Sequence, residues 1–407
     1  MSRSVKCPVY AGYPHHRHPG VDRAHEGMRR SVMDLNRRDI DIGRPALVMV
    51  TYSGLGDLAM ALPLFAALRP HFKVLPVIQP QHRDLARLLL DDGLLEDYLP
   101  IEHHLSFRSD PMGHVAIYRA LAELRPEVVL IYGKRMLALA AYLGFLRVGR
   151  SLFCDPTGFV LPATGSFEAL TPTGSRVGDY QQFAKKLGVP AWPERIEFSR
   201  EAVARMPRIC SLREKSPSPV GEGTPTDMAQ GWSSYAVVAP WASTAARSAP
   251  RRFFRECIEI ITTEARLPVV VTGTSEHRVA AADLLRGLEH HAVKNLVGAT
   301  SLRALLGLLA GARFLLSNDS GSLHLAQLVG TPSLIAFGPT APQTLFFAPP
   351  QIRLTPIQLG LPCSPCEYSS HRYRCPGPFL QCLNDLGAAQ TRDLLLKAAQ
   401  DGKRGNP

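Results

Sequence analysis

The chain has 407 residues, which excludes a single ordinary hydrophobic core and favours two domains. An apolar content of 45% with 20% charged residues is normal for a soluble globular protein. The formal net charge of +11 favours an anionic partner, such as a phosphorylated ligand, an acidic lipid surface or a nucleic acid.

No targeting or membrane segment is evident. The first residues are basic, but no apolar stretch follows them before Ala46, so we expect no secretory signal. The longest hydrophobic region, residues 128–148, is broken by Gly133, Lys134 and Arg135, which argues against a membrane span. We therefore expect a cytoplasmic protein, in which cysteines are free or metal-bound rather than paired.

Residues 1–44 are rich in Arg, His, Pro and Gly and lack apolar periodicity, so we predict a disordered basic extension. After it, short apolar runs alternate with segments of helical periodicity. The predicted strands are 46–51, 74–78 and 128–132, and the predicted helices are 58–69, 82–90, 115–124 and 136–143. Pro63 marks a kink or a late start of the first helix.

Residues 211–231 break this alternation, and their Ser, Pro, Gly and Thr content predicts a linker. The alternation then resumes. The predicted strands are 235–239, 268–272, 314–317 and 333–337, and the predicted helices are 253–265, 279–288, 302–310 and 323–329. We therefore predict an α/β protein with parallel sheets in two Rossmann-like domains, 45–210 and 232–385, with a C-terminal helix and tail at 386–407. The active site is expected in the cleft between the domains.

Residues 54–59 read Gly-Leu-Gly-Asp-Leu-Ala and fit a loose dinucleotide-binding fingerprint. Two features oppose a nicotinamide cofactor. The second strand is followed by Gln79 instead of the acid that holds a ribose. The carboxylate of Asp57 would also repel a pyrophosphate at the helix N-terminus. Asp57 has two alternative roles, as the cap of the following helix or as a general base for a substrate hydroxyl.

The second half holds a candidate anion site. A strand ends at Ser317, and a polar turn leads into the helix that carries His324. The amides of Ser320, Gly321 and Ser322 would be unpaired at the helix start, where they and the helix dipole can hold a phosphate. His324 either donates to the same anion or is a structural hydrogen-bonding residue.

Polar turns follow three more predicted strands of this half. Arg247 has the paired donors that clamp a diphosphate, although a lone surface arginine would have no such meaning. Glu276 stands where a carboxylate accepts from a ribose hydroxyl, or else it starts the next helix. With residues 337–340, these turns predict a nucleoside-diphosphate pocket in the second domain.

Several motifs occur together along the chain. Residues 54–57 (Gly-Leu-Gly-Asp) are followed by Leu62-Pro63 and by Ala-Leu-Arg at 67–69. Residues 318–326 read Asn-Asp-Ser-Gly-Ser-Leu-His-Leu-Ala, with Gly-Thr-Pro at 330–332 and Phe-Gly-Pro-Thr at 337–340. In these motifs, from about Pro45 to Leu386, the chain resembles glycosyltransferase family 9, the heptosyltransferases that build the inner core of lipopolysaccharide.

The resemblance implies a GT-B fold, with two facing Rossmann-like domains of which the second holds the nucleotide sugar. It implies inverting, metal-independent transfer of a heptose from ADP-heptose to a lipopolysaccharide inner-core or related glycan acceptor, with no cofactor required. Asp57 matches the family's catalytic base, on an acceptor-side loop with Ser53, Gly54 and Gly56. The residues matched to nucleotide-sugar binding are Arg247, Glu276, Asp319, Ser320, Gly321, Ser322 and His324.

Some positions depart from the family pattern. Trp241 replaces a usual Gly, Ala249 a usual Trp, and Ala61 a usual Thr or Ser, so the sugar donor and the acceptor stay open. The basic extension is not part of the family core. We expect it to help hold the protein at the anionic cytoplasmic face of the inner membrane, where a lipid-linked acceptor is found.

Half of the eight cysteines fall within twenty residues, at Cys363, Cys366, Cys375 and Cys382. In a cytoplasmic protein this spacing indicates a structural tetrathiolate site for zinc or iron, or else a set of structural thiols in a loop. The resemblance adds that some related heptosyltransferases bind metal there.

Three other functions stay open at this point. Another GT-B sugar-nucleotide enzyme, such as an epimerase, would act on the nucleotide sugar without an acceptor. A non-enzymatic binder would use the basic extension, but that segment lacks the interleaved aromatic residues of a nucleic-acid stacking surface, so nucleic acid is the weaker choice. An oxidoreductase is disfavoured by Gln79 and Asp57.

Overall fold

The computed structural model describes residues 44–50, 54–102, 111–146, 148–189, 192–193, 196–207, 232, 234–288, 292–345, 353–367 and 374–401. The predicted extension before Arg44, the predicted linker 211–231 and Ser53 therefore lie outside the described residues. Among the helices that are described, none is long and apolar enough to cross a membrane.

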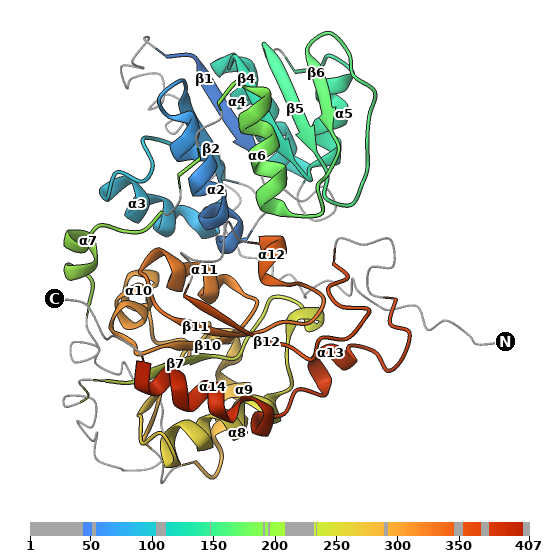
Figure 1. Ribbon diagram of the computed structural model, residues 1–407. Helices are drawn as coiled ribbons and strands as arrows, with labels where there is room; N and C mark the ends of the chain where they lie inside the picture. The colour runs from blue at the N-terminus through green and yellow to red at the C-terminus, as the bar shows by residue number, and fades with distance from the viewer. Residues whose placement is uncertain are drawn as a thin grey trace. The chain divides into compact units, whose positions relative to one another are not determined.

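The chain divides into two compact units (Figure 1). The first contains residues up to Trp192, except that Gly54–Pro63 belongs to the second unit. The second continues from Pro193 to the C-terminus, apart from His371–Arg374. Each unit has its own six-stranded sheet in which every neighbouring pair is parallel. The predicted α/β class with two parallel sheets is confirmed.

The first sheet has the strand order β3-β2-β1-β4-β5-β6. Its central strands are apolar and fully buried, because helices cover both faces. The strands are β1 (Ala46–Val50), β2 (Lys73–Ile78), β3 (Leu99–Pro100), β4 (Val128–Tyr132), β5 (Arg150–Cys154) and β6 (Phe167–Leu170). The helices are α2 (Leu55–Leu68), α3 (Arg83–Asp91), α4 (Pro111–Leu124), α5 (Arg135–Tyr142) and α6 (Arg176–Lys186), with a short 3-10 turn at Pro80–His82.

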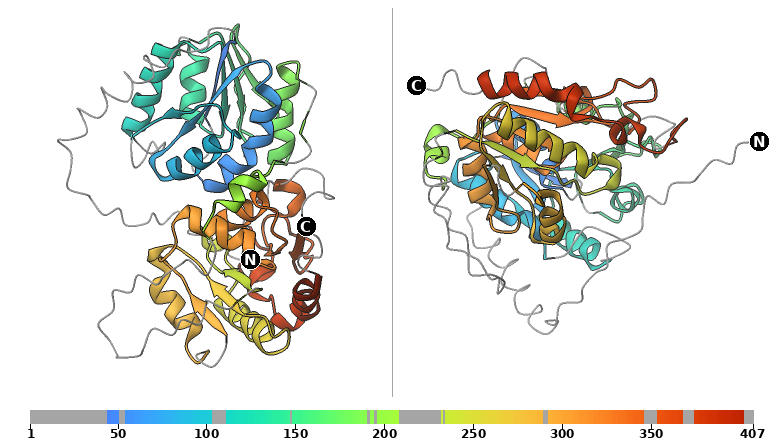
Figure 2. Two further views of the ribbon diagram at one scale, coloured as in Figure 1. Left: turned by 90° about the vertical axis from the view of Figure 1, so that its left-hand side faces the viewer. Right: turned by 90° about the horizontal axis from the view of Figure 1, so that it is seen from below.

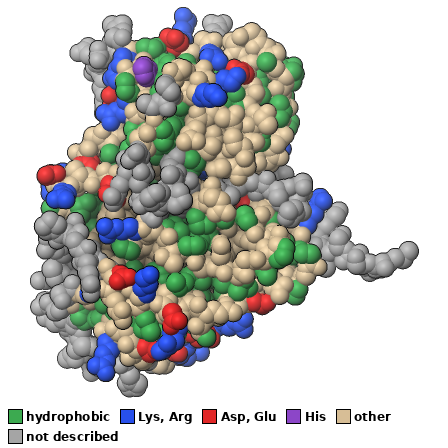
Figure 3. Space-filling model, viewed as in Figure 1, with side chains coloured by type: hydrophobic (Ala, Val, Ile, Leu, Met, Phe, Trp, Pro, Cys, Tyr) green, Lys and Arg blue, Asp and Glu red, His purple; other side chains and the backbone are tan. Residues whose placement is uncertain are grey.

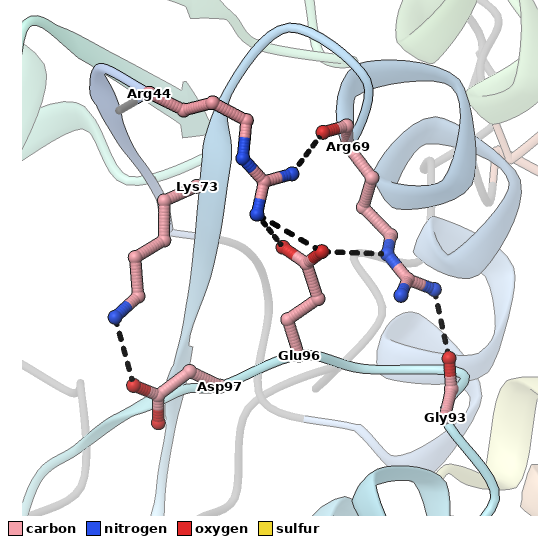
Figure 4. A network of polar contacts seen from close by, with 6 residues as sticks. All are labelled: Arg44, Arg69, Lys73, Gly93, Glu96 and Asp97. Carbon is pink, nitrogen blue, oxygen red and sulfur yellow. Dashed lines mark hydrogen bonds and ion pairs between the residues drawn. The ribbon is translucent and has the colours of Figure 1, made fainter. Parts of the chain in front are cut away.

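The residues of α2 up to Pro63 belong to the second unit, and its remaining residues belong to the first. The helix begins at Leu55 and runs through Pro63, although proline cannot donate the hydrogen bond that a helix interior requires. At the opposite end of β1, Arg44 pairs with Glu96, which also pairs with Arg69, and Lys73 pairs with Asp97 (Figure 4). These ion pairs tie the starts of β1 and β2 together at the edge of the sheet away from the strands' carboxyl ends.

The second sheet has the strand order β12-β11-β10-β7-β8-β9. The strands are β7 (Ala236–Ala239), β8 (Val269–Val271), β9 (Val293–Asn295), β10 (Leu315–Asn318), β11 (Ser333–Ala336) and β12 (Leu354–Ile357). The longer helices are α8 (Arg251–Thr263), α9 (Arg278–Leu285), α10 (Leu302–Gly311), α11 (Gly321–Leu328) and α14 (Ala388–Asp401). Short elements are α7 (Arg200–Ala204), α12 (Pro342–Leu345), α13 (Gln381–Asn384) and two 3-10 turns, Ala245–Arg247 and Ser275–His277.

Two segments outside the region from β7 to β12 complete the second unit. Phe198 donates its backbone N–H to the carbonyl of Leu328 (2.8 Å), so the chain joins this unit soon after Trp192, earlier than the predicted domain end at residue 210. At the other end, α14 lies alongside α8 (Figure 2), where Arg392 pairs with Glu264. Lys and Arg side chains are interspersed with Asp and Glu over the face that Figure 3 shows.

Candidate functional site

The carboxyl edge of the second sheet collects the predicted polar turns. In the order β11-β10-β7-β8, four neighbouring strands point the same way, so the turns that follow them share one edge. The chain proceeds outward from β7 on one side and from β10 on the other, which makes the β7–β10 boundary a topological switch point. Ligands of open α/β sheets bind at such a boundary.

Asn318, the last residue of β10, joins the two turns at this switch point. Its side-chain oxygen accepts from the backbone N–H of Ala249 (2.9 Å), and its amide nitrogen donates to the carbonyl of Pro240 (2.8 Å). One buried amide therefore holds both ends of the turn that carries Arg247. The sequence motif contains Asn318, but sequence reasoning assigned it no role.

The carboxylate of Asp319 lies beneath the surface of the candidate site. Thr340 donates its hydroxyl to Oδ2 (2.8 Å), and Nη1 of Arg247 lies 3.7 Å from the same oxygen. The Asp319 side chain is only 2% exposed, whereas that of Arg247 is 31% exposed. Thr340, which sequence reasoning noted only as part of a polar turn, thus holds the partner of Arg247.

Among the described residues, Oδ1 of Asp319 is buried and has no hydrogen-bond partner. A buried carboxylate needs compensation, and the guanidinium of Arg247 supplies it. Arg247 also donates to the hydroxyl of Ser243 (3.1 Å). The arginine is therefore fixed by a carboxylate on its inner side while part of it faces solvent.

Helix α11 starts beside this pair. Ser320 occupies the N-cap position with an extended backbone but makes no capping hydrogen bond; its hydroxyl lies 3.2 Å from that of Ser317. The amides of Gly321 and Ser322 stand in the first helical turn, where no intrahelical acceptor exists. With the positive end of the helix dipole, this start suits an anion. His324 is buried one turn further along α11.

Glu276 lies two strands away, in the 3-10 turn after β8. Its Oε1 accepts from the hydroxyl of Thr274 (2.8 Å). It also lines a cavity of about 560 Å³ whose wall includes Arg251 and Asp283. The structure therefore places Glu276 at the predicted edge of the sheet, and exposes it.

The turn before α2 is closed by Asp57. The backbone N–H of Gly54 donates to Oδ2 of Asp57 (2.8 Å), and the N–H of Asp57 donates to the carbonyl of Gly54 (3.0 Å). Asp57 is the third residue of α2, so its carboxylate reaches back to the residue before the helix, like the acid of a capping box. A methyl group at Gly54 would lie 2.9 Å from Oδ2, which explains the glycine.

Gly56 and His324 lie against each other within the second unit. A methyl group added to Gly56 would lie 2.3 Å from Cδ2 and 2.9 Å from Nε2 of His324. Only a glycine admits the imidazole at this distance. The structure therefore brings the Asp57 turn and the start of α11 together, two motifs more than 260 residues apart in the sequence.

The four late cysteines lie near one another but do not form the predicted metal group. Burial, together with the charges of Cys366, Cys375 and Cys363, raises the pKa of the Cys382 thiol to about 11. The N–H of Leu380 donates to the sulfur of Cys375 (3.4 Å). In the described part of the chain, however, no three His, Cys, Asp or Glu side chains are grouped so as to hold a metal ion.

Solved structures share this architecture. The E. coli ADP-heptose lipopolysaccharide heptosyltransferase II superposes with a TM-score of 0.58 at 17% identity, over 87% of this chain and 98% of that chain. The iron-containing dodecameric heptosyltransferase TibC of E. coli gives a TM-score of 0.51 at 14% identity, over 88% of this chain and 77% of that chain. The fold is thus that of the GT-B heptosyltransferases.

Sequence comparison finds a partial match to one family. Residues 215–375 match the family described as Glycosyltransferase family 9 (heptosyltransferase). Lipooligosaccharide heptosyltransferase 2 of Haemophilus ducreyi is 31% identical over 106 residues, which is 25% of this chain and 29% of the relative. Lipopolysaccharide heptosyltransferase 1 of Pseudomonas aeruginosa is 32% identical over 126 residues, 31% of this chain and 34% of the relative. The matches span about a third of the length of these curated relatives, and the family model matches less than half of this chain. The chain is therefore similar to glycosyltransferase family 9 over part of its second half.

Proposed function

We propose that this chain is a glycosyltransferase that transfers a heptose from ADP-heptose to a lipopolysaccharide inner-core or related glycan acceptor. The observation that carries the proposal is the contact between Gly56 and His324, because it sets a carboxylate-bearing turn beside an anion-binding helix start. The family match and the names of the curated relatives support the choice of sugar and acceptor.

In the proposed reaction, Asp57 accepts the proton of an acceptor hydroxyl as its oxygen attacks the anomeric carbon of the heptose. The bond from that carbon to the diphosphate breaks, and the electron pair leaves with ADP. Attack from the face opposite the diphosphate inverts the configuration. Since Gly54 engages one oxygen of Asp57, the turn also fixes the orientation of the carboxylate.

The leaving diphosphate gains negative charge in this step. The amides of Gly321 and Ser322, the helix dipole, His324 and Arg247 would stabilise that charge, a role that bound cations fill in other enzymes. We therefore propose that transfer is independent of added metal. Asp319 would act indirectly, by positioning Arg247.

Transfer from ADP-heptose to deacylated lipid A–Kdo tests the function directly, with product analysis by mass spectrometry and determination of the new anomeric configuration by NMR. We expect an inverted linkage, formed equally well after chelation of divalent cations. Interconversion of ADP-heptose without an acceptor would instead indicate an epimerase, and the absence of both products would contradict the proposal.

We also propose that the protein meets its lipid-linked acceptor at an anionic membrane surface. Besides the basic extension, the first unit exposes apolar side chains along and after α5, at Met136 (41%), Leu139 (37%), Leu143 (54%) and Phe145 (76%). Co-sedimentation with phosphatidylglycerol vesicles, but not with phosphatidylcholine vesicles, is expected. Unchanged co-sedimentation after Phe145→Ser and after removal of residues 1–43 would argue against both surfaces.

A further inference from the structure

Two aromatic rings are stacked at the carboxyl ends of β7 and β8. Trp241 follows β7 and His277 closes the 3-10 turn after β8; their ring centroids are 4.7 Å apart and their planes differ by 6°. Neither residue was among the predicted site residues. The family pattern places a glycine where Trp241 stands, so nothing in the resemblance explains the pair.

Contacts at the edge of the indole fix the position of Trp241. Its indole Nε1 donates to the carbonyl of Thr272 (3.0 Å), and a methyl group on Gly273 would lie 2.4 Å from the same nitrogen. The glycine therefore admits the indole edge, and the hydrogen bond holds it. Both rings are partly exposed.

Thr274 connects this aromatic pair to Glu276. Its hydroxyl donates to Oε1 of Glu276 (2.8 Å) and lies 2.8 Å from Nδ1 of His277. Because the single hydroxyl proton is used on Glu276, Nδ1 of His277 must carry a proton and donate to Thr274. Burial lowers the pKa of His277, although the charge of Glu276 opposes this, which favours a neutral imidazole with Nε2 as an acceptor.

The aromatic pair lies on the same edge of the sheet as the proposed diphosphate site. Neighbouring strands are about 4.8 Å apart, so the end of β8 is about 10 Å from the end of β10 along the sheet edge. A nucleoside diphosphate spans a similar length. With its diphosphate at Arg247 and α11 and its ribose at Glu276, the base reaches the region of the two rings.

We propose that the stacked rings of Trp241 and His277 form the platform on which the nucleobase of the donor lies, and that they favour adenine over a pyrimidine. This inference rests on the proposed nucleotide-sugar site. Stacking of a base on aromatic side chains is tolerant of sequence, but a purine covers more of the platform than a pyrimidine does. Thr274 positions both the platform and Glu276.

Binding of ADP, UDP and inorganic pyrophosphate to the full-length chain, measured by calorimetry, tests the platform. ADP should bind more tightly than UDP. Trp241→Ala should weaken ADP binding about 5- to 150-fold and leave pyrophosphate binding unchanged. The difference between the affinities for ADP and UDP should become smaller. Trp241→Phe, which keeps a ring, should retain most of the affinity. Trp232→Ala is the matched control, because Trp232 precedes β7 at the opposite edge of the sheet.

A fluorescence measurement separates stacking from a structural role. The chain has three tryptophans, so replacing Trp192 and Trp232 by Phe leaves Trp241 as the only indole. ADP should quench its emission and pyrophosphate should not. No nucleotide binding by the wild type would overturn the proposed function itself. ADP binding without quenching, or ADP affinity that is unchanged or higher in the folded Trp241→Ala variant, would overturn the platform alone.

Discussion

The imidazole of His324 lies so close to Gly56 that a single added methyl group would stand 2.3 Å from its Cδ2 atom. This contact sets the spacing between the turn that holds Asp57 and the helix start that is proposed to hold the diphosphate. A substitution here changes the geometry of the site without removing any charged or polar group.

Gly56→Ala should therefore reduce transfer by about 10²-fold or more, since displacement of a positioning group by about 1 Å costs that much. The initial rate of transfer is the measurement. Gly387→Ala is the matched control, because a methyl group there has no heavy atom within 4 Å and the backbone needs no positive φ. Equal activity of Gly56→Ala and Gly387→Ala would show that the contact has no part in transfer.

Asp57→Asn should lower the transfer rate about 10²- to 10⁴-fold while leaving ADP affinity unchanged. The amide oxygen of Asn can still accept from Gly54, so the turn keeps its shape and only the base is lost. Asp57→Ala removes both the base and the acceptor of the Gly54 hydrogen bond, so this variant should also have a lower melting temperature. Full transfer by the Asn variant would leave Asp57 with its turn-closing role alone.

Arg247→Ala should weaken ADP binding about tenfold to a hundredfold, as expected for a lost charged hydrogen bond. It should also lower stability, because the buried carboxylate of Asp319 loses its cation. Arg392→Ala, which removes a partly exposed ion pair with Glu264, is the control for both measurements. Wild-type ADP affinity in Arg247→Ala would exclude the arginine from the site.

Asp179→Ala should lower the free energy of unfolding by about 3 kcal/mol, measured in urea. The buried carboxylate of Asp179 accepts from Thr173 N–H (2.7 Å), Thr173 Oγ1 (2.9 Å) and Tyr132 OH (3.0 Å), and removing it leaves these donors without that acceptor. Ser199→Ala, which removes the hydroxyl that caps the short helix α7, should lower the free energy of unfolding by less.

The same residue gives a dependence on pH. Burial raises the pKa of Asp179 above 3.8, against the lowering effect of its hydrogen bonds. The folded chain then binds this proton more tightly than the unfolded chain, so the contribution to stability is full below pH 3.8 and is lost as the pH rises through the raised pKa. Asp179→Asn should remove this component, and identical pH profiles of the two proteins would contradict it.

Cys382 should react with iodoacetamide at pH 8 more slowly than Cys363, Cys366 and Cys375. Its thiol is buried and its pKa is raised to about 11, so little thiolate is present. Site-resolved mass spectrometry after timed labelling measures the rates.

The predictable part of the fold is its apolar interior. The strands that became β1, β4, β7 and β10 are continuous buried runs, and their alternation with helices predicts parallel sheets. The edge strands β9 and β12 carry polar residues or Pro356, and their pairing is supplied by a neighbouring strand, so no local pattern marks them. Arg150–Cys154 was also missed as a strand.

The candidate site also has a part that the sequence predicts and a part that it does not. Residues on one polar turn, such as Ser320 to His324, could be selected from the sequence because an anion site at a helix start is local. The links from Asn318 to Ala249, from Thr340 to Asp319 and from Trp241 to His277 join turns on different strands. Only the strand order decides which turns are neighbours, and periodicity does not reveal that order.

The ion pair between Arg44 and Glu96 has a consequence for protein engineering. It fixes the entry to β1 at the amino-terminal edge of the first sheet, and the five residues of the strand span about 17 Å. A reporter domain or affinity handle fused immediately ahead of Arg44 is therefore attached at the amino-terminal edge of the first sheet, a full strand length from the carboxyl end of β1. Such fusions offer a way to immobilise the protein for binding assays.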